Sequence, residues 1–159
     1  MSNPPSIRSL RPGTRAHEYA ALDEKTRDEI LRFFNGEGTS FGHTLGIQVV
    51  DVRQGYARLE LEVRPRLKQP AGVLHGGASF GLADTAVAVA LRPLYGVAAV
   101  LLTIEMKINY LEPIFDGRVI AEAYVMRASR RSAYAEVDLW AHDKLAARAT
   151  TTYMIREPR

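Results

Sequence analysis

The sequence predicts an α+β domain in which an antiparallel sheet wraps around one long buried helix. Residues 77–91 are apolar or small on every side of a helix, apart from Ser79, Asp84 and Thr85. A helix that is hydrophobic all round is buried, and this one is too short and too polar at its middle to cross a membrane. The segments around it alternate apolar and polar residues, which is typical of strands with one face in the core. Short connections join these strands and favour an antiparallel sheet.

The chain begins with a basic segment and one extra N-terminal helix. Residues 1–14 contain three prolines and no acidic residue, and we expect them to form a loose basic leader. Residues 15–36 are predicted to form a helix, because apolar residues recur at helical spacing beside a charged, solvated side. Asn35-Gly36 is a typical helix stop, and a glycine-rich connection follows as far as Gly46.

Strands and turns account for the rest of the domain. Residues 47–52 and 57–64 are predicted to pair across a turn at Gln54-Gly55. The buried helix opens at His75 and is expected to stop near Arg92, because the residue before a proline disfavours helical geometry. Three or four further strands give a sheet of five to six strands in total. Their core-facing residues alternate over 104–110, 119–125, 133–139 and 147–153.

Composition limits the classes of function that this chain can serve. Its 159 residues are enough for one domain with a substantial core. The absence of cysteine excludes disulfides, thiolate metal sites and a cysteine nucleophile. The formal net charge of +3 is largely accounted for by Arg8, Arg11 and Arg15, a basic tail that does not amount to a nucleic-acid-binding face. The N-terminus lacks the apolar core of a signal peptide, so we expect a cytoplasmic protein with neither nucleic acid nor membrane as a partner.

Two features of the buried helix point to chemistry. His75-Gly76-Gly77 opens the helix, where unpaired N–H groups and a partial positive charge can hold a developing oxyanion. Asp84 lies two turns further on among aliphatic residues, where it could act as a base on water or as a nucleophile. Structural roles stay open for all of them: turn formation for the glycines, hydrogen bonding for Asp84 and a core position for His75.

Helix geometry separates these two features. Gly76 and Asp84 are eight residues apart, so at about 1.5 Å rise per residue they lie roughly 12 Å apart along one helix. One reacting carbonyl cannot touch both. If they cooperate, Asp84 must come from a second copy of the chain whose helix runs antiparallel to the first. A two-fold dimer produces two such composite sites by symmetry.

The start of the buried helix carries a recognisable motif. It reads Gly72-Val73-Leu74-His75-Gly76-Gly77 and is followed by Leu82-Ala83-Asp84. This pattern resembles the hotdog-fold acyl-CoA thioesterases, specifically their phenylacetate-degradation and 4-hydroxybenzoyl-CoA thioesterase branch. The similarity runs over about residues 45–155, and residues 103–113 look like that family's strand after the central helix. It implies a hotdog domain over residues 45–156 that hydrolyses an acyl- or aryl-acyl-CoA to free acid and CoA.

The resemblance also implies roles for individual residues. Gly76 would supply the N–H that polarises the thioester carbonyl, and Asp84 of the opposing subunit would be the base or the nucleophile. Gln69 would position the thioester or water, His75 would help to hold the loop and the oxyanion end, and Thr103 would assist water. Ala88 departs from the family, because some members have a hydroxyl residue at that place.

Candidate substrate contacts and partners are less specific. The candidates are Gly77 beside Gly76, Phe80 (with Tyr95 and Tyr110) as pocket walls, and Arg130 and Arg131 for the phosphates of CoA. The two arginines could equally form a solvated turn. No metal or cofactor is implied, since CoA is part of the substrate. The composite-site geometry favours a homodimer, and the resemblance implies a homotetramer, a dimer of dimers in which each dimer joins its sheets edge to edge.

Three alternative functions agree less well with the sequence than a thioesterase does. A dehydratase of this fold would need a different histidine-containing loop. An acyl-CoA-sensing repressor would need a DNA-binding domain, whereas the 45 or so residues before the hotdog region hold one clear helix. A non-catalytic acyl-CoA-binding or sensing hotdog protein would be expected to lack the acid at Asp84, and it remains the main alternative. The sequence does not identify the acyl group.

Overall fold

The predicted buried helix is present as α3 (Gly76–Tyr95) in the computed structural model, which describes residues 12, 13 and 15–157. Leu82, Ala86 and Leu91 are fully buried along it. The predicted stop near Arg92 is wrong, because Pro93 lies inside the last turn and the helix continues to Tyr95, with Gly96 as its C-cap. Arg92 Nη1 donates to the carbonyl oxygens of Val97 and Ala99 at 2.8 and 2.7 Å, which ties the loop after α3 to the last turn of the helix.

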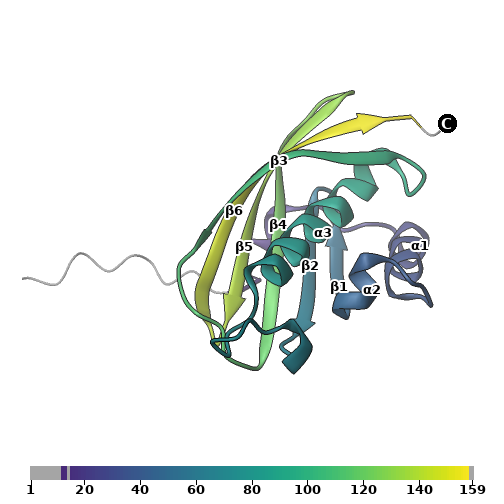
Figure 1. The fold of residues 1–159 in the computed structure, drawn as a ribbon. Helices are drawn as coiled ribbons and strands as arrows, with labels where there is room; N and C mark the ends of the chain where they lie inside the picture. Colours follow the sequence, from purple (N-terminus) through teal and green to yellow (C-terminus); the bar gives the residue numbers. More distant parts are fainter. Residues whose placement is uncertain (1–11, 14, 158–159) are drawn as a thin grey trace, which may run out of the picture.

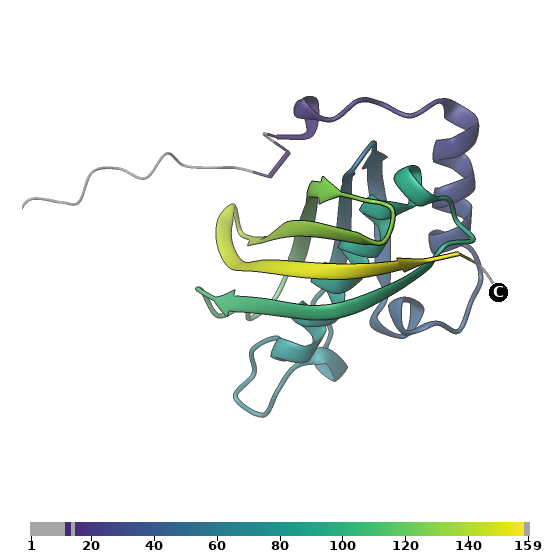
Figure 2. The ribbon, with the colours of Figure 1, turned by 90° about the horizontal axis from the view of Figure 1, so that it is seen from above.

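Six strands form one antiparallel sheet that curls around α3 (Figures 1 and 2), which confirms the predicted α+β hotdog fold. Their order in the sheet is β1-β2-β4-β5-β6-β3, so β1 and β3 are its edges. The strands are β1 (Ile47–Arg53), β2 (Tyr56–Glu62), β3 (Val100–Tyr110), β4 (Arg118–Ala128), β5 (Ser132–Ala141) and β6 (Lys144–Arg156).

Strand β3 departs from the predicted alternation. Ile104, expected to face the core, is 56% exposed. The pairing of β3 with β6 shifts its register between Thr103 and Glu105. A β-bulge of this kind redirects the side chains on either side of it. The bulge allows Thr103, expected on the opposite face, to reach α3, as the site below requires.

The N-terminal helix α1 (Glu24–Asn35) is shorter than the predicted helix over residues 15–36. It begins at Glu24 because the Asp23 carboxylate accepts the N–H of Thr26 at 2.9 Å, which caps the first turn. Before it, the chain has only a short 3₁₀ turn, η1 (Ala16–Glu18). Most of the predicted leader, residues 1–11 and 14, lies outside the described residues.

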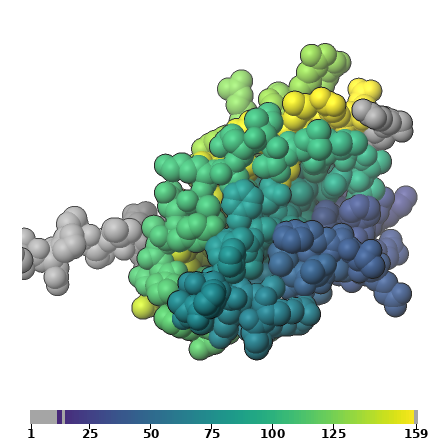
Figure 3. All heavy atoms as spheres, in the orientation of Figure 1, coloured from purple at the N-terminus to yellow at the C-terminus, as the bar shows by residue number. Residues whose placement is uncertain are grey.

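A further helix, α2 (Phe41–Leu45), interrupts the predicted glycine-rich connection. It packs on α3 and β1, and Figure 3 shows this blue segment against the teal atoms of α3 and the loop before it. A Cβ atom at Gly81 would lie 2.8 Å from Phe41 Cε1 and 2.9 Å from Leu45 Cδ1. Glycine at this point of α3 therefore permits the close approach of α2.

The two faces of the sheet are covered by different parts of the chain. The concave face holds α3 and the hydrophobic core. On the convex face, the buried Glu122 carboxylate accepts hydrogen bonds from Tyr56 Oη at 2.6 Å and from the N–H of Gly13 at 2.7 Å. Tyr19 stacks on Tyr56 with ring centroids 5.7 Å apart. Gly13 and Tyr19 therefore cover part of the convex face.

Across the residues that the structure describes, none of the helices is both long and apolar enough to span a membrane.

Candidate active site

The N-terminus of α3 presents one open backbone donor. His75 is the N-cap residue, and its Nδ1 accepts the N–H of Gly77 at 2.9 Å. Gly77, predicted beside the oxyanion position, therefore has its donor occupied in this structure. The N–H of Gly76 has no hydrogen-bond acceptor within the described part of the chain. At a helix start, such a donor adds to the positive end of the helix dipole.

Both glycines allow a side chain to come close to the helix start. Tyr110 Oη donates to the carbonyl of Gly76 at 2.9 Å, and a Cβ at Gly76 would lie 3.1 Å from that hydroxyl oxygen. A Cβ at Gly77 would lie 3.0 Å from His75 Nδ1. The His75 N–H donates to the carbonyl of Leu67 at 2.8 Å, which ties the preceding loop to this cap. The role that the resemblance implies for the His75 side chain stays a prediction.

The Asp84 carboxylate is held by two hydroxyl groups from the sheet. Its Oδ1 accepts hydrogen bonds from Thr103 Oγ1 of β3 at 2.7 Å and from Tyr153 Oη of β6 at 2.6 Å. Tyr153 Oη also lies 2.8 Å from the Asp84 carbonyl oxygen. The Asp84 Oδ2 atom has no hydrogen-bond partner within the described residues. The carboxylate is therefore oriented through one oxygen and open at the other.

Tyr153 is suited to this role because it keeps its proton. Burial and the neighbouring Asp84 carboxylate raise the pKa of Tyr153 far above its ordinary value. It therefore remains a hydrogen-bond donor well above neutral pH. The sequence pattern marked Tyr153 only as a core position of the last strand. A signal was available, since a buried tyrosine hydroxyl normally needs a hydrogen-bond partner.

Two cavities flank these groups. One, of about 280 Å³, contains Asp84. It is lined by Phe34, Ser40, Phe41, Gly42, Ile47, Val49, Thr85 and Ala88 in addition to the acid. The other, of about 340 Å³, opens at Gly76 and includes Ser79, Tyr110 and Leu111. Gly76 and Asp84 border different cavities, which agrees with their separation of about 12 Å along one helix.

The remaining predicted residues lie apart from Asp84 in this chain. The Gln69 Oε1 accepts the N–H of Ala71 at 3.4 Å, within the loop before α3. Phe80 is 36% exposed and lines none of the cavities above. Arg130 and Arg131 form the turn between β4 and β5, at the C-terminal end of α3.

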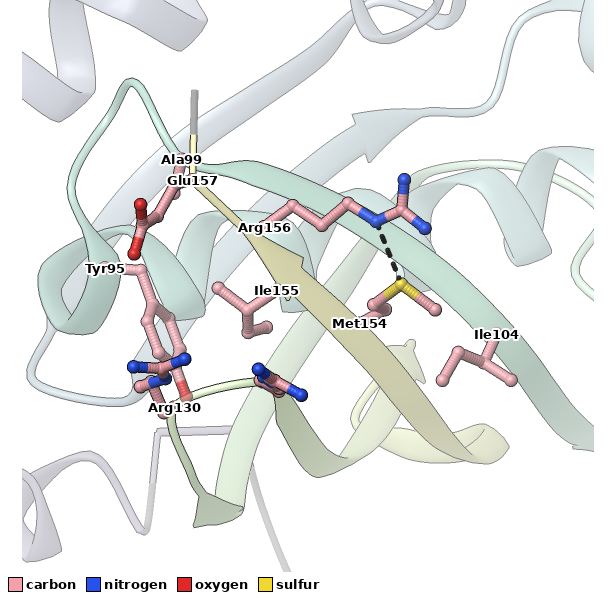
Figure 4. A pocket seen from close by; sticks show the side chains of 9 residues that line it. Tyr95, Ala99, Ile104, Arg130, Met154, Ile155, Arg156 and Glu157 are labelled. Atoms are coloured by element: carbon pink, nitrogen blue, oxygen red, sulfur yellow. Dashed lines mark hydrogen bonds between the residues drawn. The ribbon is translucent and has the colours of Figure 1, made fainter. Parts of the chain in front are cut away.

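The two arginines border a third cavity, of about 840 Å³ (Figure 4). Tyr95 and Arg156 also line it, as does Glu157. Figure 4 shows Arg130 beside the ring of Tyr95, whose hydroxyl donates to the carbonyl of Ser129 at 2.6 Å. Three guanidinium groups against one carboxylate make this cavity suitable for an anion. No group of three or more histidine and acidic side chains within the described residues could hold a metal ion.

Comparison with known proteins places this geometry in a family. The model of the thioesterase superfamily matches residues 71–147. The chain is 31% identical over 98 residues to the proofreading thioesterase EntH of Klebsiella pneumoniae, covering 62% of this chain and 71% of that protein. It is 28% identical over 117 residues to the 1,4-dihydroxy-2-naphthoyl-CoA hydrolase of Listeria monocytogenes, covering 73% of this chain and 95% of that one.

A solved structure agrees with these relatives. A mutant of the phenylacetic acid degradation protein PaaI from Thermus thermophilus is 31% identical and superposes with a TM-score of 0.67. The match covers 72% of this chain and 96% of that one. The similarities support a hydrolase that acts on thioesters. The chain, with its open Gly76 donor and oriented Asp84 on one buried helix, belongs to the thioesterase superfamily.

Proposed function

We propose that this protein is an acyl-CoA thioesterase that hydrolyses an acyl- or aryl-acyl-CoA to the free acid and CoA. The observation that carries the proposal is the pair of groups on α3: a helix-start N–H without an acceptor and a carboxylate held through one oxygen only. The names of relatives add support for the CoA ester, since one of them is a naphthoyl-CoA hydrolase. The reaction needs no cofactor, because CoA is part of the substrate.

In the proposed reaction, the thioester carbonyl oxygen accepts the N–H of Gly76. Negative charge develops on that oxygen as the carbonyl carbon becomes tetrahedral, and the helix dipole stabilises it. Asp84 either takes a proton from the attacking water or attacks the carbonyl carbon itself to form an anhydride. In both routes the C–S bond breaks, CoA leaves as the thiol after protonation, and water supplies the hydroxyl of the acid. Thr103 and Gln69 would position the water or the thioester.

The proposed site combines two subunits, because Gly76 and Asp84 of one chain cannot meet at one carbonyl. A homodimer with antiparallel α3 helices would bring Gly76 of one copy to Asp84 of the other. Strand β3 favours an edge-to-edge dimer, since it pairs only with β6 within the described residues. Leu102 and Ile104 of this edge are 42% and 56% exposed. An apolar open edge is a typical surface for strand pairing with a second copy. Two such dimers would form the proposed tetramer.

The phosphates of CoA would bind at the cavity of Arg130 and Arg131. This cavity lies beside Tyr95, eleven residues beyond Asp84, or roughly 16 Å along the helix axis. In acyl-CoA, the thioester lies far from the nucleotide and its phosphates. A phosphate site at some distance from Asp84 is therefore what this substrate requires. The guanidinium groups are exposed, so their contribution to binding should weaken with added salt.

Hydrolysis assays test the proposal directly. Thiol release is measured for short, medium, long-chain and aromatic acyl-CoAs, with matching oxygen esters as controls. We expect turnover of at least one thioester class and its loss, by at least about a hundredfold in kcat, in Asp84→Ala. Tight binding of acyl-CoA without turnover of any thioester would instead identify a non-catalytic acyl-CoA-binding protein.

A further inference from the structure

The cavity at Asp84 has walls that come from two parts of the chain. One wall is α3, through Thr85 and Ala88, and the other is the segment from α1 to β1, through Phe34, Phe41 and Val49. The family match begins at residue 71. The outer wall therefore precedes the segment that matches the family model.

The outer wall is held in place by its own contacts. Asn35 and Val49 exchange two hydrogen bonds of 2.8 Å, which fixes the end of α1 against β1. His43 is held between Ser40 Oγ and the carbonyl of Gly36, both at 2.7 Å. The close packing of α2 on Gly81 adds a third restraint. The cavity is thus largely preformed, as ligand sites usually are.

Its polar atoms are already paired, apart from the acid. Ser40 Oγ is hydrogen-bonded to His43 Nδ1, and Thr85 Oγ1 donates to the carbonyl of Gly81 at 2.7 Å. The rest of the lining is aliphatic or aromatic. A ligand in this cavity would find apolar contacts beside one carboxylate, and a polar substituent on it would be left without a hydrogen-bond partner, which is costly.

The volume limits what the cavity can hold. A dry apolar cavity of about 150 Å³ accommodates benzene. The cavity at Asp84, at about 280 Å³, has room for a phenyl ring with a short linker or for a medium-length alkyl chain. A long fatty acyl chain would not fit without opening the α1–α2 wall.

We propose that this cavity receives the acyl group, and that Phe41 and Ala88 set the largest group accepted. The inference rests on the proposed thioesterase function and narrows the substrate to a thioester with an apolar, medium-sized alkyl or unsubstituted aryl acyl group. Ala88 lines the cavity from α3 and Phe41 lines it from α2, so the size of either side chain changes the space for the acyl group. The CoA portion would extend away from the acid, towards the helix start of the partner subunit.

Two substitutions of opposite effect test this assignment. Ala88→Leu adds three carbons to the cavity. It should lower kcat/KM for octanoyl-CoA and phenylacetyl-CoA at least about tenfold, since one methylene in an apolar pocket changes discrimination by about 10–200-fold. Acetyl-CoA should change by less than about threefold, because so small a group leaves room for leucine. Phe41→Ala widens the cavity and should raise the ratio of dodecanoyl- to octanoyl-CoA turnover at least about threefold.

The matched control is Leu111→Ala, which trims a side chain bordering the other cavity. It should leave the chain-length preference unchanged. A shift of preference in Leu111→Ala, with none in Phe41→Ala or Ala88→Leu, would place the acyl group in the cavity at Gly76 and overturn the inference. Phe41 is 63% exposed, so its truncation should keep the fold even if Ala88→Leu does not.

The wild-type panel separates the two levels of the proposal. If the wild-type protein hydrolyses no thioester, the proposed function fails. If it hydrolyses thioesters but prefers long-chain acyl groups, or 4-hydroxybenzoyl-CoA over benzoyl-CoA, only the cavity assignment is wrong.

Discussion

Replacing Tyr153 with phenylalanine tests whether the sheet orients the Asp84 carboxylate. The change removes one oxygen atom from a side chain that is 2% exposed, and leaves the ring in place. Two contacts of that oxygen disappear, at 2.6 Å to Asp84 Oδ1 and at 2.8 Å to the Asp84 carbonyl. Thr103 Oγ1 remains as a donor to Oδ1 at 2.7 Å. The substitution therefore halves the hydrogen bonding of the carboxylate without opening a large cavity.

The expected loss of stability follows from the negative charge on the hydrogen-bond acceptor, the Asp84 carboxylate. A hydrogen bond to a charged group contributes about 1.5–3 kcal/mol, so the free energy of unfolding should fall by about 2 kcal/mol. For a chain of this size, that corresponds to a fall in Tm of roughly 4–8 °C. We also expect kcat to fall about tenfold, or about 1.4 kcal/mol in activation free energy, because Asp84 can then rotate out of the reactive position. KM should change by less than about twofold, since Tyr153 is a positioning residue.

Urea unfolding at one fixed protein concentration measures the stability, with the single, buried tryptophan Trp140 as the fluorescent probe. Tyr134→Phe is the matched control. Tyr134 lies on the neighbouring strand β5, is 39% exposed, and its hydroxyl has no hydrogen bond within the described residues. The control should change neither the free energy of unfolding nor kcat. If Tyr153→Phe loses less than about 0.5 kcal/mol and keeps its kcat, the hydroxyl does not restrain Asp84 and the reasoning is refuted.

Three further predictions concern the assembly, the substrate and the pH. Mixing a Gly76→Pro chain with an Asp84→Ala chain should restore up to about a quarter of wild-type activity after subunit exchange; no recovery despite proven exchange would rule out a shared site. Substituting Arg130 and Arg131 together with alanine should raise KM for acyl-CoA about fivefold at low salt, with kcat kept, and a KM that stays constant would remove them from CoA binding. Above pH 10, stability should fall more steeply in the wild type than in Tyr153→Phe, by about 1.4 kcal/mol per pH unit. Stability falls with rising pH because the raised pKa of Tyr153 keeps its proton bound in the folded chain, while the unfolded chain releases it. If the free energy of unfolding, measured in urea between pH 9 and pH 11, depends equally on pH in both proteins, this prediction is contradicted.

Local patterns were enough to predict the α+β layout, whereas the hotdog fold was implied by the resemblance. The strands β1 and β2 and the turn between them follow from strict alternation around Gln54-Gly55, and α3 follows from its continuous apolar surface. Errors arose at element ends, at the unpredicted helix α2 and at the bulge in β3. The helix over 15–36 was extended too far because apolar residues continued at helical spacing, although the cap at Asp23 sets the start of α1. Capping and proline effects depend on a few atoms, so periodicity alone does not locate them.

The site was predictable only where one short segment contained it. His75, Gly76 and Asp84 all belong to α3 or its cap, and their spacing already separates the donor from the acid. Tyr153 could not be assigned to Asp84 from the sequence, because the two are 69 residues apart and meet only through the register of β6. Thr103 was assigned a role by resemblance, yet its contact with Asp84 requires the bulge in β3. Long-range register and bulges are tertiary properties that local alternation does not encode.

The hydrogen bonds to Asp84 explain how an acid can remain inside an apolar helix. Asp84 is half-buried among apolar side chains of α3, where a carboxylate without hydrogen-bond donors would be destabilising. Hydroxyl donors from Thr103 and Tyr153 orient the half-buried carboxylate without introducing a cation, which would hold it in an ion pair. The same two bonds connect α3 to the strands β3 and β6. Stability and reactivity therefore depend on one set of contacts, and this is why a single oxygen atom on Tyr153 should affect both.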